Sequence, residues 1–120
     1  MNVITDQLKL GIEGKSTLKY LYAKQGDKNS RFIRVTLDAG SGTITLGTGA
    51  TAKIRALLPD GTTVAESATI NNDDTISVEL SENILRTKGL VKADIAVFGS
   101  SGSVLSSEVF CIRVQEALIQ

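Results

Sequence analysis

The stretch with the most chemical potential is the polar run Asn71-Asn72-Asp73-Asp74, whose side-chain oxygens could bind calcium. A calcium loop needs alternating acidic positions, a glycine and a more distant glutamate, and the run lacks this pattern. Its two aspartates are neighbours in the chain, so on a strand they would point to opposite faces and make a poor acid and base pair for glycoside hydrolysis. We therefore interpret the run as a turn.

A nucleophile with a partner base is also missing from the sequence. The chain has no histidine, which is the commonest general base and the commonest metal ligand, and it has one cysteine, Cys111. Cys111 lies between Phe110 and Ile112 in a strand-like segment, away from any group that would activate a thiol, and is interpreted as a packing or surface thiol. We predict no catalytic residue, no cofactor and no metal site, and expect that the protein is not an enzyme.

Glycines at 40, 42, 47 and 49 superficially resemble a phosphate-binding loop. No lysine follows them, and no junction of a strand with a helix accompanies them, so they are interpreted as loop glycines.

A polar corner at Gly26, Asp27, Ser30 and Arg31 opens into a segment of alternating apolar and polar residues. These four residues are candidates for a surface that faces a partner protein. The alternative is that Asp27 and Ser30 cap a turn while Arg31 is solvated.

Length and charge restrict the class of protein. The 120 residues suffice for one domain with its own core, and 13 basic residues balance 13 acidic ones with no block of like charge. We therefore expect neither nucleic-acid binding nor attachment to an anionic membrane, and no segment approaches the roughly 20 apolar residues of a membrane span. The start of the chain lacks the pattern of a signal peptide, and a lone cysteine forms no internal disulfide, so synthesis in a cytoplasm is expected.

Alternation with a period of two recurs along the chain and predicts an all-β fold. In residues 32–37, for example, Ile33, Val35 and Leu37 should face the core. Pro59-Asp60-Gly61 is a turn signal that predicts a hairpin between the strands on either side of it. Eight strands are predicted, at residues 8–12, 18–23, 32–37, 52–58, 63–70, 75–80, 91–97 and 105–114.

One short helix is predicted near residues 81–88. Ser81 is suited to the N-cap, Glu82 to the first turn, and Gly89 to a left-handed C-terminal cap. Ile84 and Leu85 would then close one end of the core. Together these patterns predict an immunoglobulin-like antiparallel β-sandwich of about eight strands with one short helix.

Four elements in order carry a resemblance to a known family: Gly26-Asp27 before the strand at 31–37, the turn Pro59-Asp60-Gly61-Thr62, the strand start at 89–95, and the segment 106–114. Over residues 4 to 116 this order resembles the amino-terminal domain of the baseplate upper proteins of tailed phages that infect Gram-positive bacteria. The resemblance implies a sandwich domain at residues 1–120, the amino-terminal domain of a longer structural protein. It also implies a virion location, with the tail hub and other baseplate proteins as partners.

Two functions follow as hypotheses. The first is a virion structural module that attaches a receptor-binding arm to the central tail hub, as a homo-oligomer in the assembled virion. The alternative is a carbohydrate-binding module that recognises a host cell-wall saccharide. Exposed aromatic faces would favour the alternative, and Tyr20, Tyr22, Phe32 and Phe98 are the candidates, although packing is the expected use of most of them.

Overall fold

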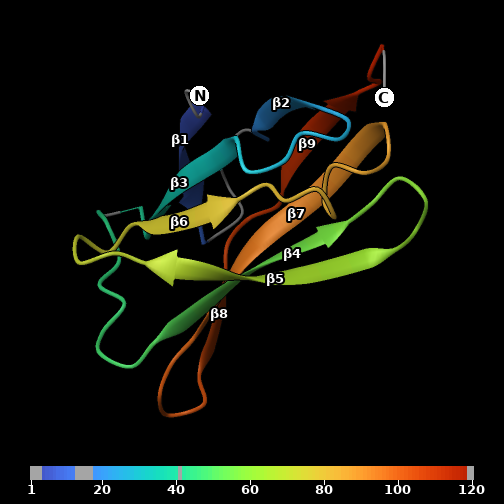
Figure 1. Ribbon diagram of the computed structural model, residues 1–120. Coiled ribbons are helices and arrows are strands. Elements are labelled where there is room, and N and C mark those ends of the chain that lie inside the picture. Colours follow the sequence, from blue (N-terminus) through green and yellow to red (C-terminus); the bar gives the residue numbers. More distant parts are fainter. Residues whose placement is uncertain (1–3, 13–17, 41, 119–120) are drawn as a thin grey trace.

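A computed structural model describes residues 4–12, 18–40 and 42–118 of the chain. The fold is all-β, as predicted, and Figure 1 shows the strands curled around a common interior. These described residues form nine strands: β1 (Ile4–Gly11), β2 (Tyr20–Lys24), β3 (Arg31–Asp38), β4 (Thr51–Leu57), β5 (Thr63–Ile70), β6 (Ile76–Glu79), β7 (Gly89–Phe98), β8 (Val104–Ser106) and β9 (Phe110–Gln115).

The strands form one mixed, curled sheet that resembles half of a barrel, in the order β1-β3-β6-β5-β4-β7-β9-β2, with β8 beside β7. Strand β5 joins the two halves of this path, because it pairs with β4 through Ala68 and with β6 at Thr69 and Ile70. The two outermost pairs, β1 with β3 and β2 with β9, are parallel. The predicted antiparallel pairing is therefore wrong at both ends, and the immunoglobulin-like sandwich is not confirmed.

Three tight turns share one geometry. In the turn at Pro59, the N–H of Gly61 donates to the carbonyl of Leu58 (3.0 Å), and Gly61 adopts a φ of 86°. The hairpin predicted from Pro59-Asp60-Gly61 is confirmed, since β4 and β5 pair in antiparallel register from Ala52 to Leu57. The turns at residues 71–75 and 99–103 repeat the same hydrogen bonds, so the run at 71–74 is a turn, as predicted.

The predicted helix at 81–88 is wrong, because this segment consists of turns and bends and no helix occurs in the described residues. The N–H groups of Ile84 and Leu85 both donate to the carbonyl of Ser81 (3.1 and 3.0 Å), which makes a single helical turn. The Ser81 hydroxyl, which was expected to cap the helix, donates a hydrogen bond to Glu66 of β5 instead. Ile84 and Leu85 are nonetheless fully buried and close one end of the core, as predicted.

The predicted strand at 105–114 is divided into β8 and β9 by Ser107, the one buried polar residue described. The Ser107 N–H donates to the carbonyl of Ile95 (2.8 Å), and the Ser107 hydroxyl accepts a hydrogen bond from the Ile95 N–H (2.9 Å). This serine thus satisfies the backbone of β7 where its partner changes from β8 to β9.

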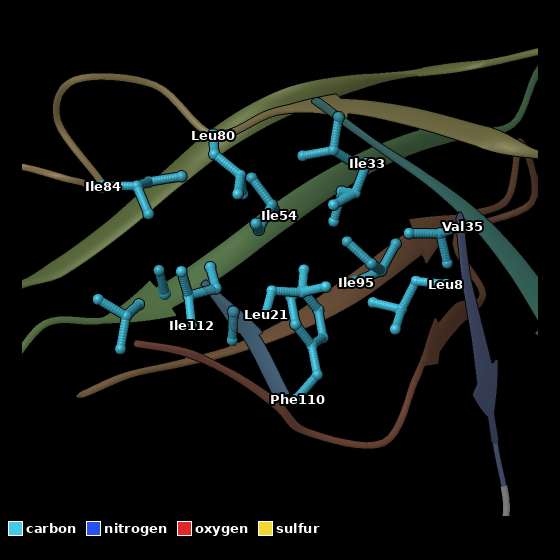
Figure 2. Packing of buried hydrophobic residues seen from close by; sticks show 14 of the residues in the cluster. Leu8, Leu21, Ile33, Val35, Ile54, Leu80, Ile84, Ile95, Phe110 and Ile112 are labelled. Atoms are coloured by element: carbon cyan, nitrogen blue, oxygen red, sulfur yellow. The ribbon is translucent and has the colours of Figure 1, made fainter. Parts of the chain in front are cut away.

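The core lies on the inner side of the curl (Figure 2). Ile33, Val35 and Leu37 of β3 are fully buried, as their alternation predicted, and Phe110 of β9 belongs to the same core cluster with no exposed surface. Ala52, Ile54, Ala56 and Leu58 point inward in the same way. In the described part of the chain, nothing forms a helix able to cross a bilayer.

Candidate interaction surface

Strands β5, β4, β7, β9 and β2 are neighbours in the sheet (Figure 1), and their outer side is rich in basic residues. Because side chains alternate along a strand, the residues between the buried positions of these strands point away from the core. Five of these outward residues are basic, and the described acidic residue among them is Asp94. We call this surface the cationic face; its charged residues are Lys24, Lys53, Arg55, Lys92, Arg113 and Asp94.

Asp94 is fully engaged by Arg55. The two residues are register partners on β7 and β4, and the guanidinium donates through Nε to Oδ1 (2.8 Å) and through Nη2 to Oδ2 (2.7 Å). A third hydrogen bond runs from Nη2 to the Ser106 hydroxyl (3.0 Å). The hydrogen bond and the charge of Asp94 raise the pKa of Arg55. The ion pair therefore orients Arg55 and uses both oxygens of Asp94, the described carboxylate of the face.

The remaining cations have no carboxylate partner among the described residues. Lys24, Lys92 and Arg113 are exposed and make no described ion pair. The ammonium of Lys53 lies 6.0 Å from the centre of the Phe98 ring, at the outer limit of a cation–π contact. Four positive side chains are thus available to an external anion.

Apolar side chains lie beside these cations. A depression of about 520 Å³ opens over β4, β5 and β7, and its lining includes Leu57, Ala65 and Val109 together with Arg55 and Lys92. Leu57 of β4 and Val109, which directly precedes β9, keep 45% and 46% of their surface exposed, so both side chains offer apolar contact area at the depression. This combination of an apolar floor and a charged margin suits a protein contact.

Strand β2 ends the described sheet and exposes two aromatic rings. Tyr20 and Tyr22 point outward and are 48% and 59% exposed, whereas Leu21 and Ala23 are buried between and beside them. In the register, Tyr20 lies opposite Cys111 and Tyr22 opposite Arg113. The two rings therefore extend the cationic face to the edge of the sheet. Cys111 itself is buried, which agrees with a packing thiol rather than a surface thiol.

The polar corner predicted to face a partner lies between β2 and β3, next to the 81–88 segment. Arg31 donates through Nε to Oδ2 of Asp27 (2.8 Å), and the same oxygen accepts from the Lys24 N–H (3.3 Å). The Gly26 N–H donates to the carbonyl of Leu85 (3.1 Å), and the Ser30 carbonyl accepts from the Ile4 N–H (2.8 Å). Asp27 thus stabilises the turn, and Arg31 is paired rather than solvated.

The oxygen-rich turn at 71–74 uses its carboxylates within the fold. Asp73 accepts from the hydroxyl (2.5 Å) and the N–H (3.1 Å) of Thr75, and these bonds lower the pKa of Asp73. Asp74 accepts from the Leu46 N–H (3.2 Å). Within residues 4–12, 18–40 and 42–118, no group of three His, Cys, Asp or Glu side chains is arranged to hold a metal ion.

Sequence reasoning did not single out the cationic face, although part of its signal is visible in the sequence. Lys53 and Arg55 alternate with the buried residues of β4, so the period of a strand points both side chains away from the core. Lys92 and Arg113 follow the same rule on β7 and β9. Their gathering on one surface depends on the order β4-β7-β9-β2, which alternation alone does not specify.

Solved structures support the fold. The N-terminal domain of phage TP901-1 ORF48 aligns with a TM-score of 0.70 at 16% sequence identity, over 93% of this chain and 99% of that one. CopC from Methylosinus trichosporium OB3b aligns with a TM-score of 0.50 at 14% identity, over 87% of this chain and 90% of that one. At such identities the likeness concerns the fold alone.

Sequence comparison extends this likeness to a family. No curated protein matches the chain. The family model of the BppU N-terminal domain, the amino-terminal domain of baseplate upper proteins, matches residues 5–120. This match spans nearly the whole chain and agrees with the resemblance carried by the turn and strand motifs. The chain therefore belongs to the family of baseplate upper protein N-terminal domains.

Proposed function

We propose that the protein is a structural module of a phage tail baseplate, which attaches a receptor-binding arm to the central tail hub through protein–protein contacts. The observation that carries this proposal is the family match over residues 5–120, since the family has a structural role in the phage baseplate. A protein of this kind needs a contact surface, and a typical stable contact buries about 800 Å² on each partner.

The cationic face is the surface that we assign to this contact. It combines exposed tyrosines, free cations and an apolar depression on rigid strands. The corner at Gly26, Asp27, Ser30 and Arg31 directly follows β2 in the chain, and we propose that it forms the margin of the same contact. The Asp27–Arg31 ion pair would hold this margin in a fixed shape.

Several further features complete the proposal. Residues 1–120 would be the amino-terminal domain of a longer structural protein, made in the cytoplasm of the bacterial host and present as a homo-oligomer in the assembled virion. The baseplate family supports a virion tail location with other baseplate proteins as partners. A structural family also supports a role without catalysis.

Light scattering on a size-exclusion column tests the attachment. The chain is run alone and then with the purified tail hub protein of the same phage, each at tens of micromolar, a range that covers transient contacts. Co-elution at a fixed stoichiometry is expected. Separate elution of the two proteins would contradict attachment to the hub.

A second candidate function is recognition of a host cell-wall saccharide, and one observation favours it. Tyr20 and Tyr22 are exposed on the same side of β2, two residues apart, and aromatic rings of this kind can stack on sugars. Titration with cell-wall oligosaccharides would then change tyrosine fluorescence in a saturable way, and Tyr22→Ala would weaken the response. A flat titration would exclude this function for the saccharides used.

A further inference from the structure

We infer that the cationic face docks against an acidic surface of a neighbouring baseplate protein, one whose carboxylates surround an exposed apolar side chain. This inference rests on the proposed function and adds the chemistry of the partner. It follows from three features of the face: unpaired cations, their closeness to one another, and the apolar depression beside them.

The charges of the face are not balanced within the domain. The whole chain has 13 basic and 13 acidic residues, yet five basic residues meet one described carboxylate here. Arg55 pairs with that carboxylate, and the side chains of Lys24, Lys92 and Arg113 make no described ion pair. On the outer side of β3, β6 and β1 the described charges are balanced, and Lys9 pairs with Asp38 at 3.2 Å. Among the described residues, the imbalance is therefore found on the cationic face and not on the outer side of β3, β6 and β1.

Two of the unpaired cations are neighbours on adjacent strands. Arg113 of β9 lies opposite Leu90 of β7, and Lys92 is two residues further along β7 on the same side. Such diagonal positions are roughly 7 Å apart, a distance at which like charges repel in the free domain. Carboxylates of a partner would remove this repulsion and would form charge-assisted hydrogen bonds with both side chains.

The charge pattern also argues against a second copy of this chain as the occupant. Two copies that met through this face would bring Lys92 and Arg113 of one chain against the cations of the other. Like charges brought together across an interface repel each other, so pairing of this kind is disfavoured. An acidic partner is complementary to the face, whereas another copy is not.

The apolar part of the contact would come from the depression and the strand edge. Leu57, Ala65 and Val109 offer a floor for an apolar side chain of the partner. Tyr20 and Tyr22 lie on the same side of the sheet, and tyrosine is one of the residue types enriched among the residues that dominate interface binding energy. The surrounding cations would then set orientation and partner choice, since charge complementarity contributes mostly to specificity and association rate.

Charge reversal with a matched control tests the inference. The variant is Arg113→Glu on the cationic face, and the control is Arg34→Glu, an exposed outward arginine of β3. Each is titrated with the purified tail hub protein and, separately, with each other purified baseplate protein of the same phage. Lys92→Glu is a second variant in case Arg113→Glu does not melt cooperatively.

The inference predicts that Arg113→Glu weakens binding to its partner about tenfold or more, while Arg34→Glu changes it less than about twofold. Raising the salt from about 50 mM to about 500 mM should weaken the wild type more than Arg113→Glu, because salt screens the exposed pairs. If a different baseplate protein shows this pattern and the hub does not bind, the inference stands and the hub assignment fails.

Two results would overturn the inference. If the hub binds but Arg113→Glu and Lys92→Glu behave like Arg34→Glu, the cationic face is not the docking surface, while attachment to the hub stands. If no baseplate protein binds the wild type, both the inference and the proposed attachment fail.

Discussion

Gly11 and Glu108 are joined by two hydrogen bonds that connect the two arms of the curled sheet. The Glu108 N–H donates to the carbonyl of Gly11 (2.8 Å), and the Gly11 N–H donates to Oε1 of Glu108 (3.0 Å). Gly11 ends β1, and Glu108 lies two residues before β9, at opposite sides of the strand order. The two hydrogen bonds therefore connect the end of β1 to the segment before β9, although β1 and β9 are not neighbours in the sheet.

Glu108→Ala should destabilise the domain, because the Gly11 N–H loses its acceptor in a partly buried position. The expected loss is about 1 kcal/mol, measured by urea unfolding. Glu108→Gln is the matched control, since its side-chain oxygen can still accept from Gly11, and it should cost less than the alanine variant. Equal losses for the two variants would show that this hydrogen bond is not what Glu108 contributes.

Gly89→Ala should be strongly destabilising. Gly89 begins β7 rather than capping a helix, has a φ of 125°, and would place a Cβ atom 2.9 Å from Cγ of Pro59. Backbone strain and a clash with a rigid ring then add together. Gly61→Ala is the control, because its φ is 86° but its Cβ would meet nothing within 4 Å, so only strain of about 1–2 kcal/mol applies.

Thermal melting of the two glycine variants checks this difference. Gly89→Ala should lower the melting temperature more than Gly61→Ala, and adding Pro59→Ala should recover part of the Gly89→Ala loss. Similar melting temperatures for the two single variants would mean that the fold absorbs the contact with Pro59.

Ser107→Ala should cost about 1–3 kcal/mol of unfolding free energy, because the buried N–H of Ile95 would lose its acceptor. Ser106→Ala, at the exposed end of β8, removes a hydrogen bond that Arg55 donates and should cost less than about 0.5 kcal/mol. Denaturant unfolding of both variants makes the comparison. A loss for Ser106→Ala that equals that of Ser107→Ala would contradict the role assigned to Ser107.

Acid should destabilise the domain through two turn aspartates. Hydrogen bonds from Thr62 lower the pKa of Asp60, and hydrogen bonds from Thr75 lower the pKa of Asp73, from an ordinary value of 3.8. A folded-state pKa below the unfolded value adds stability above pH 3.8, and this stability is lost as the pH falls through the folded-state pKa.

Melting temperatures recorded at a series of pH values from above 3.8 downward test the effect. As the pH falls, the melting temperature should decrease less steeply for the double variant Asp60→Asn and Asp73→Asn than for the wild type. Asn72→Ser, a neutral exchange in an exposed turn position, should leave the slope unchanged. A double variant with the wild-type slope would place the acid sensitivity elsewhere in the protein.

The sequence by itself determined the all-β class, most strand positions, the β4–β5 hairpin and the inward residues of β3 and β4. Each of these depends on local geometry: alternation follows from the period of a strand, and the turn at Pro59 follows from the φ of proline and the freedom of Gly61. The family resemblance was likewise carried by the order of such local motifs, and the family match confirms it.

Only the tertiary structure decided the pairing and the surfaces. The parallel pairs β1–β3 and β2–β9 join segments far apart in the chain, and nothing in a single strand specifies its neighbour. The same non-local contacts overrode local preference at Ser81, whose hydroxyl meets Glu66 of β5 instead of capping a helix. The cationic face arises for this reason too: each strand sets which residues point outward, but strand order alone brings Lys92 and Arg113 together.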